Sequence, residues 1–327
     1  MRPSALTSIG SSTVAALLVT GCMTTKNGTL APRTPAATSA RPTASLVDAL
    51  LFHPSREPRG GWEPDRPSVE VARFRAADGS RLSGWFAEAK QPRAVVLYCE
   101  GNAGNITSRR WVLDLFRDGM GTSVMIFDYR GYGQSEGSPS RAGILEDARA
   151  ARRWLAERAG VPEGEIVLVG SSLGGAVAVD LAARDGARGL VLESTFSSLK
   201  ELAGSHFGRL ARLAVSSELD SASKIGGYDG PLLQVHGDAD RVVPYELGKR
   251  LHDAANPPKR FVRVAGGDHN DPPTREYLDA LDKFLGSLPP TRPAQVKARG
   301  SVGQVPLPLG EVARRAGEGD SVKTKQP

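Results

Sequence analysis

Short apolar runs alternate with longer helix-like segments through the middle of the chain. Two runs, 69–74 and 82–86, flank Asp78-Gly79, a pair that favours a tight hairpin turn. Six further runs are almost continuously apolar, at residues 94–98, 124–127, 166–169, 190–192, 232–235 and 261–264. Strands of that kind are buried on both faces, whereas residues 141–158 and 174–184 have helical periodicity. The pattern predicts an α/β fold, with a mostly parallel sheet of about eight strands and helices on both faces.

The two ends of the chain lack this alternation. Residues 23–45 are mainly Thr, Ala, Pro and Arg, and we interpret them as a flexible tether. Residues 289–327 mix Pro, Gly and charged residues and are predicted to be disordered. Residues 46–288 remain, enough for one large domain with a well-buried core.

The charge distribution bears on possible partners. The 327 residues have a net charge of +6, which raises the possibility of nucleic-acid binding. Four basic and no acidic residues lie in 1–45, and seven basic and three acidic residues lie in 290–327. The stretch 46–289 therefore holds 31 basic and 33 acidic residues. A slightly acidic middle argues against nucleic acid as a partner, and basic flanks fit a membrane surface equally well.

The N-terminal residues have the features of a secretion signal. Arg2 is followed by an uncharged stretch with its apolar centre at residues 15–19. Residues 19–22, Val-Thr-Gly-Cys, resemble the bacterial lipobox, in which the cysteine is lipidated and becomes the mature N-terminus. The resemblance implies a signal peptide over residues 1–22 and a lipid on Cys22. It also implies export across the inner membrane and anchoring in the cell envelope. The alternative is an ordinary signal peptide with a chance cysteine.

Metal and redox chemistry have no signature in the sequence. The second cysteine, Cys99, ends an apolar run and is expected to be buried in a strand. With no C-x-x-C pair and no other metal-ligand spacing, we expect neither a metal nor an organic cofactor.

Residues 170–175, Gly-Ser-Ser-Leu-Gly-Gly, contain a G-x-S-x-G pattern between a predicted strand and a predicted helix. In that setting a sharp turn projects the central serine above the sheet. Ser172 is therefore the candidate nucleophile. The backbone N–H of Leu173 lies at the helix start, where unpaired donors favour an anion.

A serine hydroxyl needs a base to remove its proton, and the base needs a carboxylate to orient it. Of the histidines after Ser172, His269 alone follows the last strand; the others are His206, His236 and His252. We therefore take His269 as the candidate base. Two aspartates, Asp238 and Asp240, follow the preceding strand, and the longer loop slightly favours Asp240.

Five motifs together resemble one branch of the α/β-hydrolases, which includes acyl-protein thioesterases and esterases. They lie at residues 99–105, 128–135, 170–175, 236–244 and 267–271. The resemblance implies Ser172 as nucleophile, Asp240 as acid and His269 as base. It further implies an oxyanion hole formed by the backbone N–H groups of Asn102 and Leu173. The loop at 128–135 is expected to shape the pocket wall.

One position departs from that branch, whose oxyanion loop usually begins His-Gly-Asn. Here the loop reads Glu100-Gly101-Asn102, which brings a carboxylate near the site. A working enzyme would neutralise Glu100 by an ion pair or a raised pKa. Arg130 and Arg109 are the candidate cations.

The usual position of the cap in this fold lies at about residues 195–230. Here Phe207, Leu210, Leu213 and Val215 alternate with Arg209 and Arg212. This spacing permits a short amphipathic helix that either packs on its own domain, roofs an acyl pocket or touches lipid.

These observations predict a lipid-anchored serine hydrolase that cleaves carboxylic esters or thioesters through an acyl-enzyme. The expected partners are a small acyl ester or thioester and, through Cys22, a membrane. Two alternatives remain: an aminopeptidase or amidase on the same fold, and a catalytically silent envelope lipoprotein.

Overall fold

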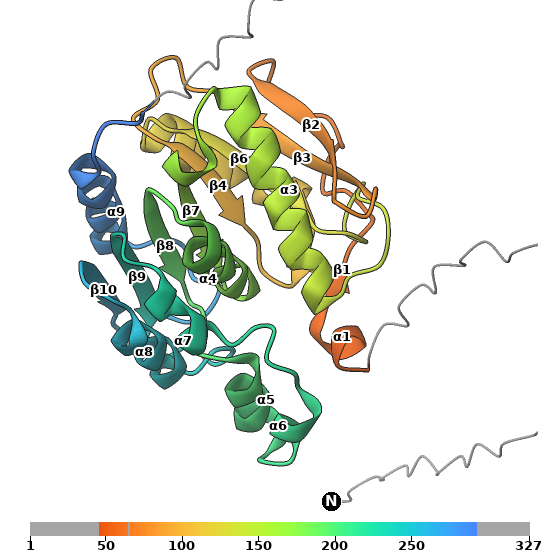
Figure 1. The fold of residues 1–327 in the computed structure, drawn as a ribbon, viewed down its shortest axis with the longest axis vertical. Helices are drawn as coiled ribbons and strands as arrows, with labels where there is room; N and C mark the ends of the chain where they lie inside the picture. The colour runs from red at the N-terminus through yellow and green to blue at the C-terminus, as the bar shows by residue number, and fades with distance from the viewer. Residues whose placement is uncertain (1–45, 65, 293–327) are drawn as a thin grey trace, which may run out of the picture. The chain divides into compact units, whose positions relative to one another are not determined.

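The computed structural model describes residues 46–64 and 66–292. Eight strands form one sheet in the order β2-β3-β6-β4-β7-β8-β9-β10 (Figure 1). The pairs β2–β3 and β3–β6 are antiparallel, and every other neighbouring pair in this sheet is parallel. The strands are β2 (Val69–Arg75), β3 (Arg81–Ala87), β4 (Val95–Cys99), β6 (Ser123–Asp128), β7 (Ile166–Ser171), β8 (Gly189–Glu193), β9 (Leu232–Gly237) and β10 (Lys259–Val264). This arrangement confirms the predicted fold class, because each of the eight apolar runs lies within or overlaps one strand.

Helices cover both faces of the sheet. On one face α3 (Arg141–Ala159) and α4 (Leu173–Asp185) lie across the central strands (Figure 1), and α8 (Tyr245–Ala254) packs into the same core. On the other face lie α2 (Arg110–Leu113), η2 (Asp114–Gly119) and α9 (Arg275–Ser287). Alternate side chains of β4 enter the two cores, which explains why its apolar run is continuous.

Shorter elements complete the domain. A two-stranded parallel sheet joins β1 (His53–Pro54) to β5 (Ala103–Gly104). The remaining short helices are α1 (Leu46–Leu51), η1 (Ile106–Arg109), η3 (Glu163–Glu165), α5 (Leu199–Phe207), α6 (Ala211–Ala214), α7 (Ser221–Lys224) and η4 (Ile225–Gly227). The cap between β8 and β9 therefore consists of α5, α6, α7 and η4 rather than one amphipathic helix.

The hairpin between β2 and β3 forms where the sequence predicts it. Gly79 adopts a φ of +87°, a conformation that glycine reaches without strain, and the Asp78 carboxylate accepts a hydrogen bond from Ser80 N at 3.0 Å. Cys99 is fully buried at the end of β4, as expected.

Several predictions concern residues at the chain ends. The signal with Cys22, the tether at 23–45 and residues 293–327 of the predicted tail lie outside the described residues. The last described residues still contact the domain, since the Arg188 guanidinium donates to the Pro289 carbonyl at 2.8 Å and to the Thr291 hydroxyl at 2.6 Å. Within the described ranges, no helix combines the length and apolar character that crossing a bilayer requires.

Candidate active site

Ser172 occupies a strained turn between β7 and α4. Its φ of +53° and ψ of −118° lie outside the regions that residues with a side chain normally adopt. Two hydrogen bonds from the neighbouring strand region hold the turn: Ser172 N donates to the Glu193 carbonyl at 2.9 Å, and the Thr195 hydroxyl donates to the Ser172 carbonyl at 2.7 Å. The surrounding structure thus fixes the turn that presents the Ser172 side chain.

The glycines of the G-x-S-x-G pattern are required by close backbone contacts. A methyl group on Gly170 would collide with the backbone of Gly174 across the turn. A methyl group on Gly174 would in turn collide with the carbonyl of Cys99 at the end of β4. Both glycines therefore let α4 begin directly against the strands.

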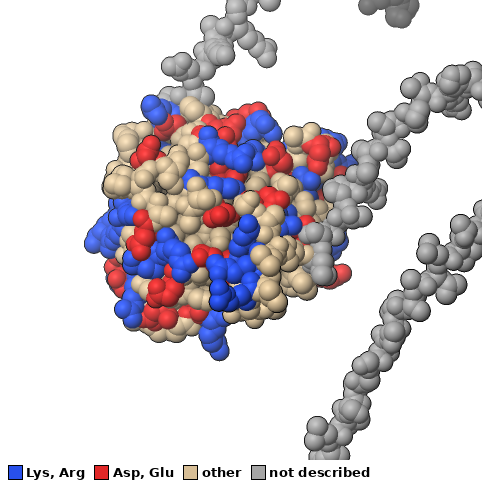
Figure 2. Space-filling model, turned by 60° about the horizontal axis from the view of Figure 1, so that its bottom comes forward, with Lys and Arg blue, Asp and Glu red and all other residues tan. Residues whose placement is uncertain are grey.

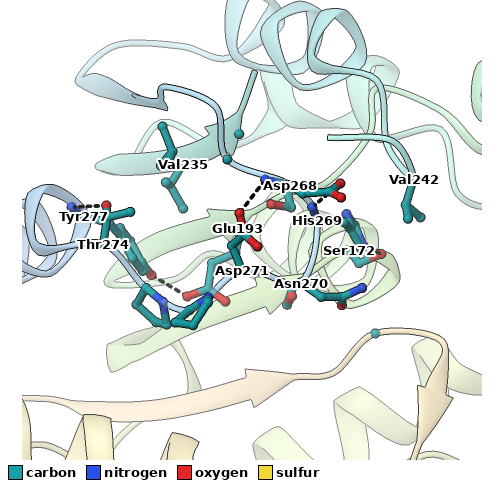
Figure 3. A pocket seen from close by; sticks show the side chains of 18 of the residues that line it. Ser172, Glu193, Val235, Val242, Asp268, His269, Asn270, Asp271, Thr274 and Tyr277 are labelled. Atoms are coloured by element: carbon teal, nitrogen blue, oxygen red, sulfur yellow. Dashed lines mark hydrogen bonds between the residues drawn. The ribbon is translucent and has the colours of Figure 1, made fainter. Parts of the chain in front are cut away.

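The structure brings the three residues of the predicted triad together. His269 follows β10, Asp240 follows β9, and Ser172 follows β7. Figure 3 shows His269 beside Ser172. His269 Nδ1 lies 2.8 Å from Asp240 Oδ2, and His269 Nε2 lies 3.1 Å from Ser172 Oγ. With the proton on Nδ1, the imidazole donates to Asp240 and accepts from the serine hydroxyl.

Asp240 is held as an ionised acceptor. Burial alone would raise its pKa, but hydrogen bonds from His236, His269 and the Val243 backbone outweigh burial and lower it well below its ordinary value. Asp240 Oδ1 accepts from Val242 N at 2.9 Å and from Val243 N at 2.7 Å. His236 is fully buried behind the same loop, with Nε2 2.9 Å from the Val243 carbonyl. His236 therefore supports the Asp240 loop.

Asp238 has different partners. Its carboxylate accepts from Arg263 Nε at 2.8 Å and from Gly266 N at 2.7 Å. These bonds use both carboxylate oxygens, and they lower the pKa of Asp238. Of the two aspartates that the sequence leaves in competition, Asp240 alone contacts His269.

The predicted oxyanion residues flank Ser172. Leu173 is the first residue of α4, and a methyl group on Gly101 would lie 3.6 Å from Ser172 Cβ, which places the loop containing Asn102 beside the serine. The Asn102 carbonyl accepts from His53 N at 2.9 Å and from the Tyr132 hydroxyl at 2.7 Å. These two hydrogen bonds to the Asn102 carbonyl therefore fix the loop in place.

The loop at 128–135 does not have the position that the sequence predicts. None of its residues lines the pocket described below, so the expectation that it shapes the pocket wall is wrong. It supports the oxyanion loop from behind instead. The Tyr129 hydroxyl donates to the Glu100 carbonyl at 3.1 Å, and Asp128 Oδ1 accepts from Ile106 N at 2.9 Å. The contacts form because both loops follow neighbouring parallel strands.

Glu100 is buried, with 5% of its surface exposed. Burial raises the pKa of Glu100 to about 8; Arg109 partly offsets this effect, and Asp128 adds to it. Arg109 Nε lies 3.7 Å from Glu100 Oε2, so this contact is long. Arg130, the other candidate cation, does not pair with Glu100. Its guanidinium binds the carboxylates of Asp147, at 2.8 Å, and of the exposed Asp78. Asp147 is within reach because it lies on α3, which packs near the loop that contains Arg130.

A pocket of about 730 Å³ opens beside Ser172 and His269 (Figure 3). Its apolar lining includes Val235, Val242 and Val264, and its polar lining includes Glu193 and Asp271. The space is large enough for a substrate of drug-like size.

Sequence reasoning missed a hydrogen-bonded cluster in this pocket. Glu193 ends β8, and its carboxylate accepts from the Tyr98 hydroxyl at 2.9 Å and from the Tyr277 hydroxyl. Burial raises the pKa of Glu193, and it raises the pKa of both tyrosines well above 10. The two phenols therefore stay protonated as donors. The position of Glu193 at a strand end is the one signal that could have drawn attention to it.

A family model and two bacterial relatives match this chain. A model of the alpha/beta hydrolase fold matches residues 94–213. The uncharacterized protein Rv2307c of Mycobacterium tuberculosis is 39% identical over 242 residues, which cover 72% of this chain and 86% of that protein. The uncharacterized protein YfhR of Escherichia coli K12 is 37% identical over 247 residues, 70% of this chain and 85% of that protein.

A solved structure supports the fold assignment. The esterase Pf2001 of Pyrococcus furiosus superposes with a TM-score of 0.58 at 20% identity, over 73% of this chain and 97% of the esterase. At that identity the match shows the fold alone. The fold, the family model and the two bacterial relatives together show that the chain belongs to the α/β-hydrolase family that includes Rv2307c and YfhR.

Proposed function

We propose that the protein is a serine hydrolase that cleaves carboxylic esters or thioesters through an acyl-enzyme. The observation that carries the proposal is the hydrogen-bonded series from Asp240 through His269 to Ser172. The series opens into a pocket with an apolar wall, and the structural neighbour Pf2001 is called an esterase. Roles for the individual residues follow from this geometry.

Acylation begins when His269 Nε2 takes the proton of Ser172 Oγ as the oxygen attacks the carbonyl carbon. Asp240, kept ionised by its hydrogen bonds, fixes the imidazole tautomer and stabilises the imidazolium that forms. The backbone N–H groups of Leu173 and Asn102 donate to the negative oxygen of the tetrahedral intermediate. His269 then returns the proton to the leaving alkoxide or thiolate, and the acyl group stays on Ser172.

Deacylation repeats these steps with water. His269 removes a proton from a water molecule, whose oxygen attacks the acyl carbon on Ser172. Collapse of the second intermediate releases a carboxylic acid and restores the serine hydroxyl. Val235 and Val264 line the pocket, and in this proposal they contact the acyl group.

Labelling with a fluorophosphonate tests the nucleophile. We expect Ser172→Ala to abolish labelling and to lower kcat on a soluble ester by several orders of magnitude. Ser171→Ala is the matched control, since Ser171 is the adjacent serine and also lines the pocket. It should retain labelling. Labelling that persists in Ser172→Ala, or disappears in Ser171→Ala alone, would assign the nucleophile elsewhere.

Location belongs to the same proposal. The lipobox-like residues 19–22 and the basic N-terminal flank support export and lipid attachment at Cys22. An enzyme anchored in this way would meet its ester substrates in the cell envelope.

A second candidate function is an aminopeptidase or amidase. Glu193 supports it, because a fixed carboxylate in the pocket can accept hydrogen bonds from a substrate ammonium group. Comparing an aminoacyl amide with an ester of the same acyl group distinguishes the two. Faster release of the amine, lost in Glu193→Gln, would favour the amidase; preference for the ester would favour the first proposal.

A further inference from the structure

The end of the cap exposes three large apolar side chains. Phe207, Leu210 and Leu213 are 78%, 81% and 84% exposed, where α5 turns into α6. None of the three belongs to a hydrophobic cluster of the described residues. We call these three residues the cap tip. Single exposed leucines are ordinary in soluble proteins, but three within seven residues at one turn form an unusual surface.

The cap tip is distinct from the face that holds the cap on the domain. Leu199 is buried, and Leu202 and Ala203 pack against the main core. Val215, just after α6, is also buried. The cap thus has its own packing face, and the cap tip lies outside it, which leaves the cap tip available for contact with another surface.

The cap tip lies near the mouth of the pocket. His206, which precedes Phe207, has Nε2 2.7 Å from the carbonyl of Val242. Val242 lines the pocket, is 45% exposed, and its backbone N–H binds Asp240. A surface that contacts the cap tip would therefore come close to the entrance of the pocket.

Basic residues lie on the same two helices as these apolar residues and on the turn between them. Lys200, Arg209 and Arg212 lie on α5, α6 and the turn between them, where Glu201 is the sole acidic residue. Arg212 and Arg250 both contact the Glu201 carboxylate, so its charge is already balanced. Figure 2, which brings this end of the domain forward, shows Lys and Arg side chains interspersed with Asp, Glu and uncharged surface. Apolar residues among basic ones suit an anionic lipid surface.

The described chain also begins at this end of the domain. Arg141 donates from Nε to Asp48 of α1 at 2.8 Å and from Nη1 to Ser216, which follows α6 in the cap (Figure 1). The 23 residues from 23 to 45 separate Cys22 from α1, a span of at most about 80 Å. A lipid on Cys22 would hold this end within reach of the membrane.

We propose that the cap tip docks on the surface of an anionic membrane and brings the pocket mouth to the lipid. Phe207, Leu210 and Leu213 enter the interface while Arg209 stays at the headgroups. The proposal also concerns the substrate, and this part rests on the proposed function: the substrates are esters presented at the membrane surface.

Vesicle binding tests docking without any need for activity. Full-length protein with Cys22→Ser, which removes the proposed lipid, is mixed with phosphatidylcholine vesicles that contain or lack an equimolar share of phosphatidylglycerol. In this background the triple change Phe207→Ser, Leu210→Ser, Leu213→Ser should lower the partition coefficient on anionic vesicles about tenfold or more. Arg209→Gln should lower it about fivefold, and only on anionic vesicles. Arg260→Gln, an exposed arginine on β10, is the matched charge control and should change nothing.

The enzymatic part has a separate readout. The triple variant should hydrolyse a soluble ester at the wild-type rate, which also shows that it folds, and should be slower on an ester embedded in vesicles. Equal vesicle binding by the triple variant and its parent would overturn the docking proposal. A dimer in the parent that becomes a monomer in the triple variant, with vesicle binding unchanged, would assign the cap tip to self-association instead. Absence of hydrolysis by the parent would reject the proposed function and leave the binding result standing.

Discussion

Replacing Glu100 with Gln should stabilise the protein in a strongly pH-dependent way. The carboxyl is buried beside the oxyanion loop, and its pKa is raised from the ordinary 4.5 to about 8. Between these two values the folded protein keeps a proton that the unfolded chain has released. The free energy of unfolding therefore falls as pH rises through this window. Glutamine has nearly the same shape and carries no charge, so it removes this dependence.

The size of the effect follows from the raised pKa. Each pH unit between the unfolded and folded values lowers the free energy of unfolding by about 1.4 kcal/mol. At pH 5 the two proteins should differ by less than about 1 kcal/mol, and at pH 8 Glu100→Gln should be more stable by about 4 kcal/mol. The Arg109 contact at 3.7 Å is too long to hold the carboxylate ionised at neutral pH.

Urea unfolding of both proteins at pH 5 and pH 8 measures this difference. Glu157→Gln is the matched control, because Glu157 is exposed on α3 and its loss should change neither curve. Activity gives a second reading. Near pH 7 the variant should keep kcat/KM within a few-fold of wild type, since Glu100 is already neutral there. Above pH 8 the wild type should become relatively slower, as negative charge develops near the oxyanion.

Parallel unfolding energies for wild type and Glu100→Gln between pH 5 and pH 8 would refute this reasoning. They would mean that Glu100 is already ionised and compensated in the folded state. Complete loss of activity in Glu100→Gln would instead give the carboxyl a direct part in the reaction.

Three further predictions follow from specific contacts. Asp240→Asn should lower kcat by about 10³–10⁴, whereas Asp238→Asn should change it little; the reverse ranking in ester kinetics would move the acid to Asp238. Arg130→Ala should lower the free energy of unfolding by about 3 kcal/mol, because it leaves the carboxylate of Asp147 buried and unpaired, and chemical denaturation checks this. Cys22→Ser should prevent incorporation of radiolabelled lipid in cells, and a variant that still incorporates it would exclude this cysteine as the anchor.

Much of the fold could be predicted because its signals are local. The eight apolar runs correspond to the eight strands of the main sheet. The central strands β4, β6 and β7 are apolar at nearly every position because they are buried on both faces. The order of the serine, the aspartate pair Asp238 and Asp240, and His269 along the chain could also be read from the sequence. Parallel strands bring their carboxyl ends to one edge, so residues after three different strands meet there.

The choice between neighbouring residues needed long-range contacts. Asp238 and Asp240 lie in one loop, and they differ in their partners. Asp238 binds Arg263, which lies within β10, and Asp240 binds His269, which follows β10. Likewise Arg130 pairs with Asp147 on α3, so Arg109 is the candidate cation that contacts Glu100. Sequence spacing gives the reach of a side chain but not the direction in which it points.

The sequence by itself determined the sheet, the glycine turn at Ser172 and the set of candidate groups, because periodicity and backbone sterics act over a few residues. The sequence favoured Asp240 over Asp238, and the contact with His269 is seen only in the tertiary structure. Tertiary structure alone decided that Glu193 lies between two tyrosines and that the cap tip stays outside the core. Those outcomes depend on packing between segments far apart in the chain, where burial sets both the pKa of a carboxyl group and the exposure of an apolar side chain.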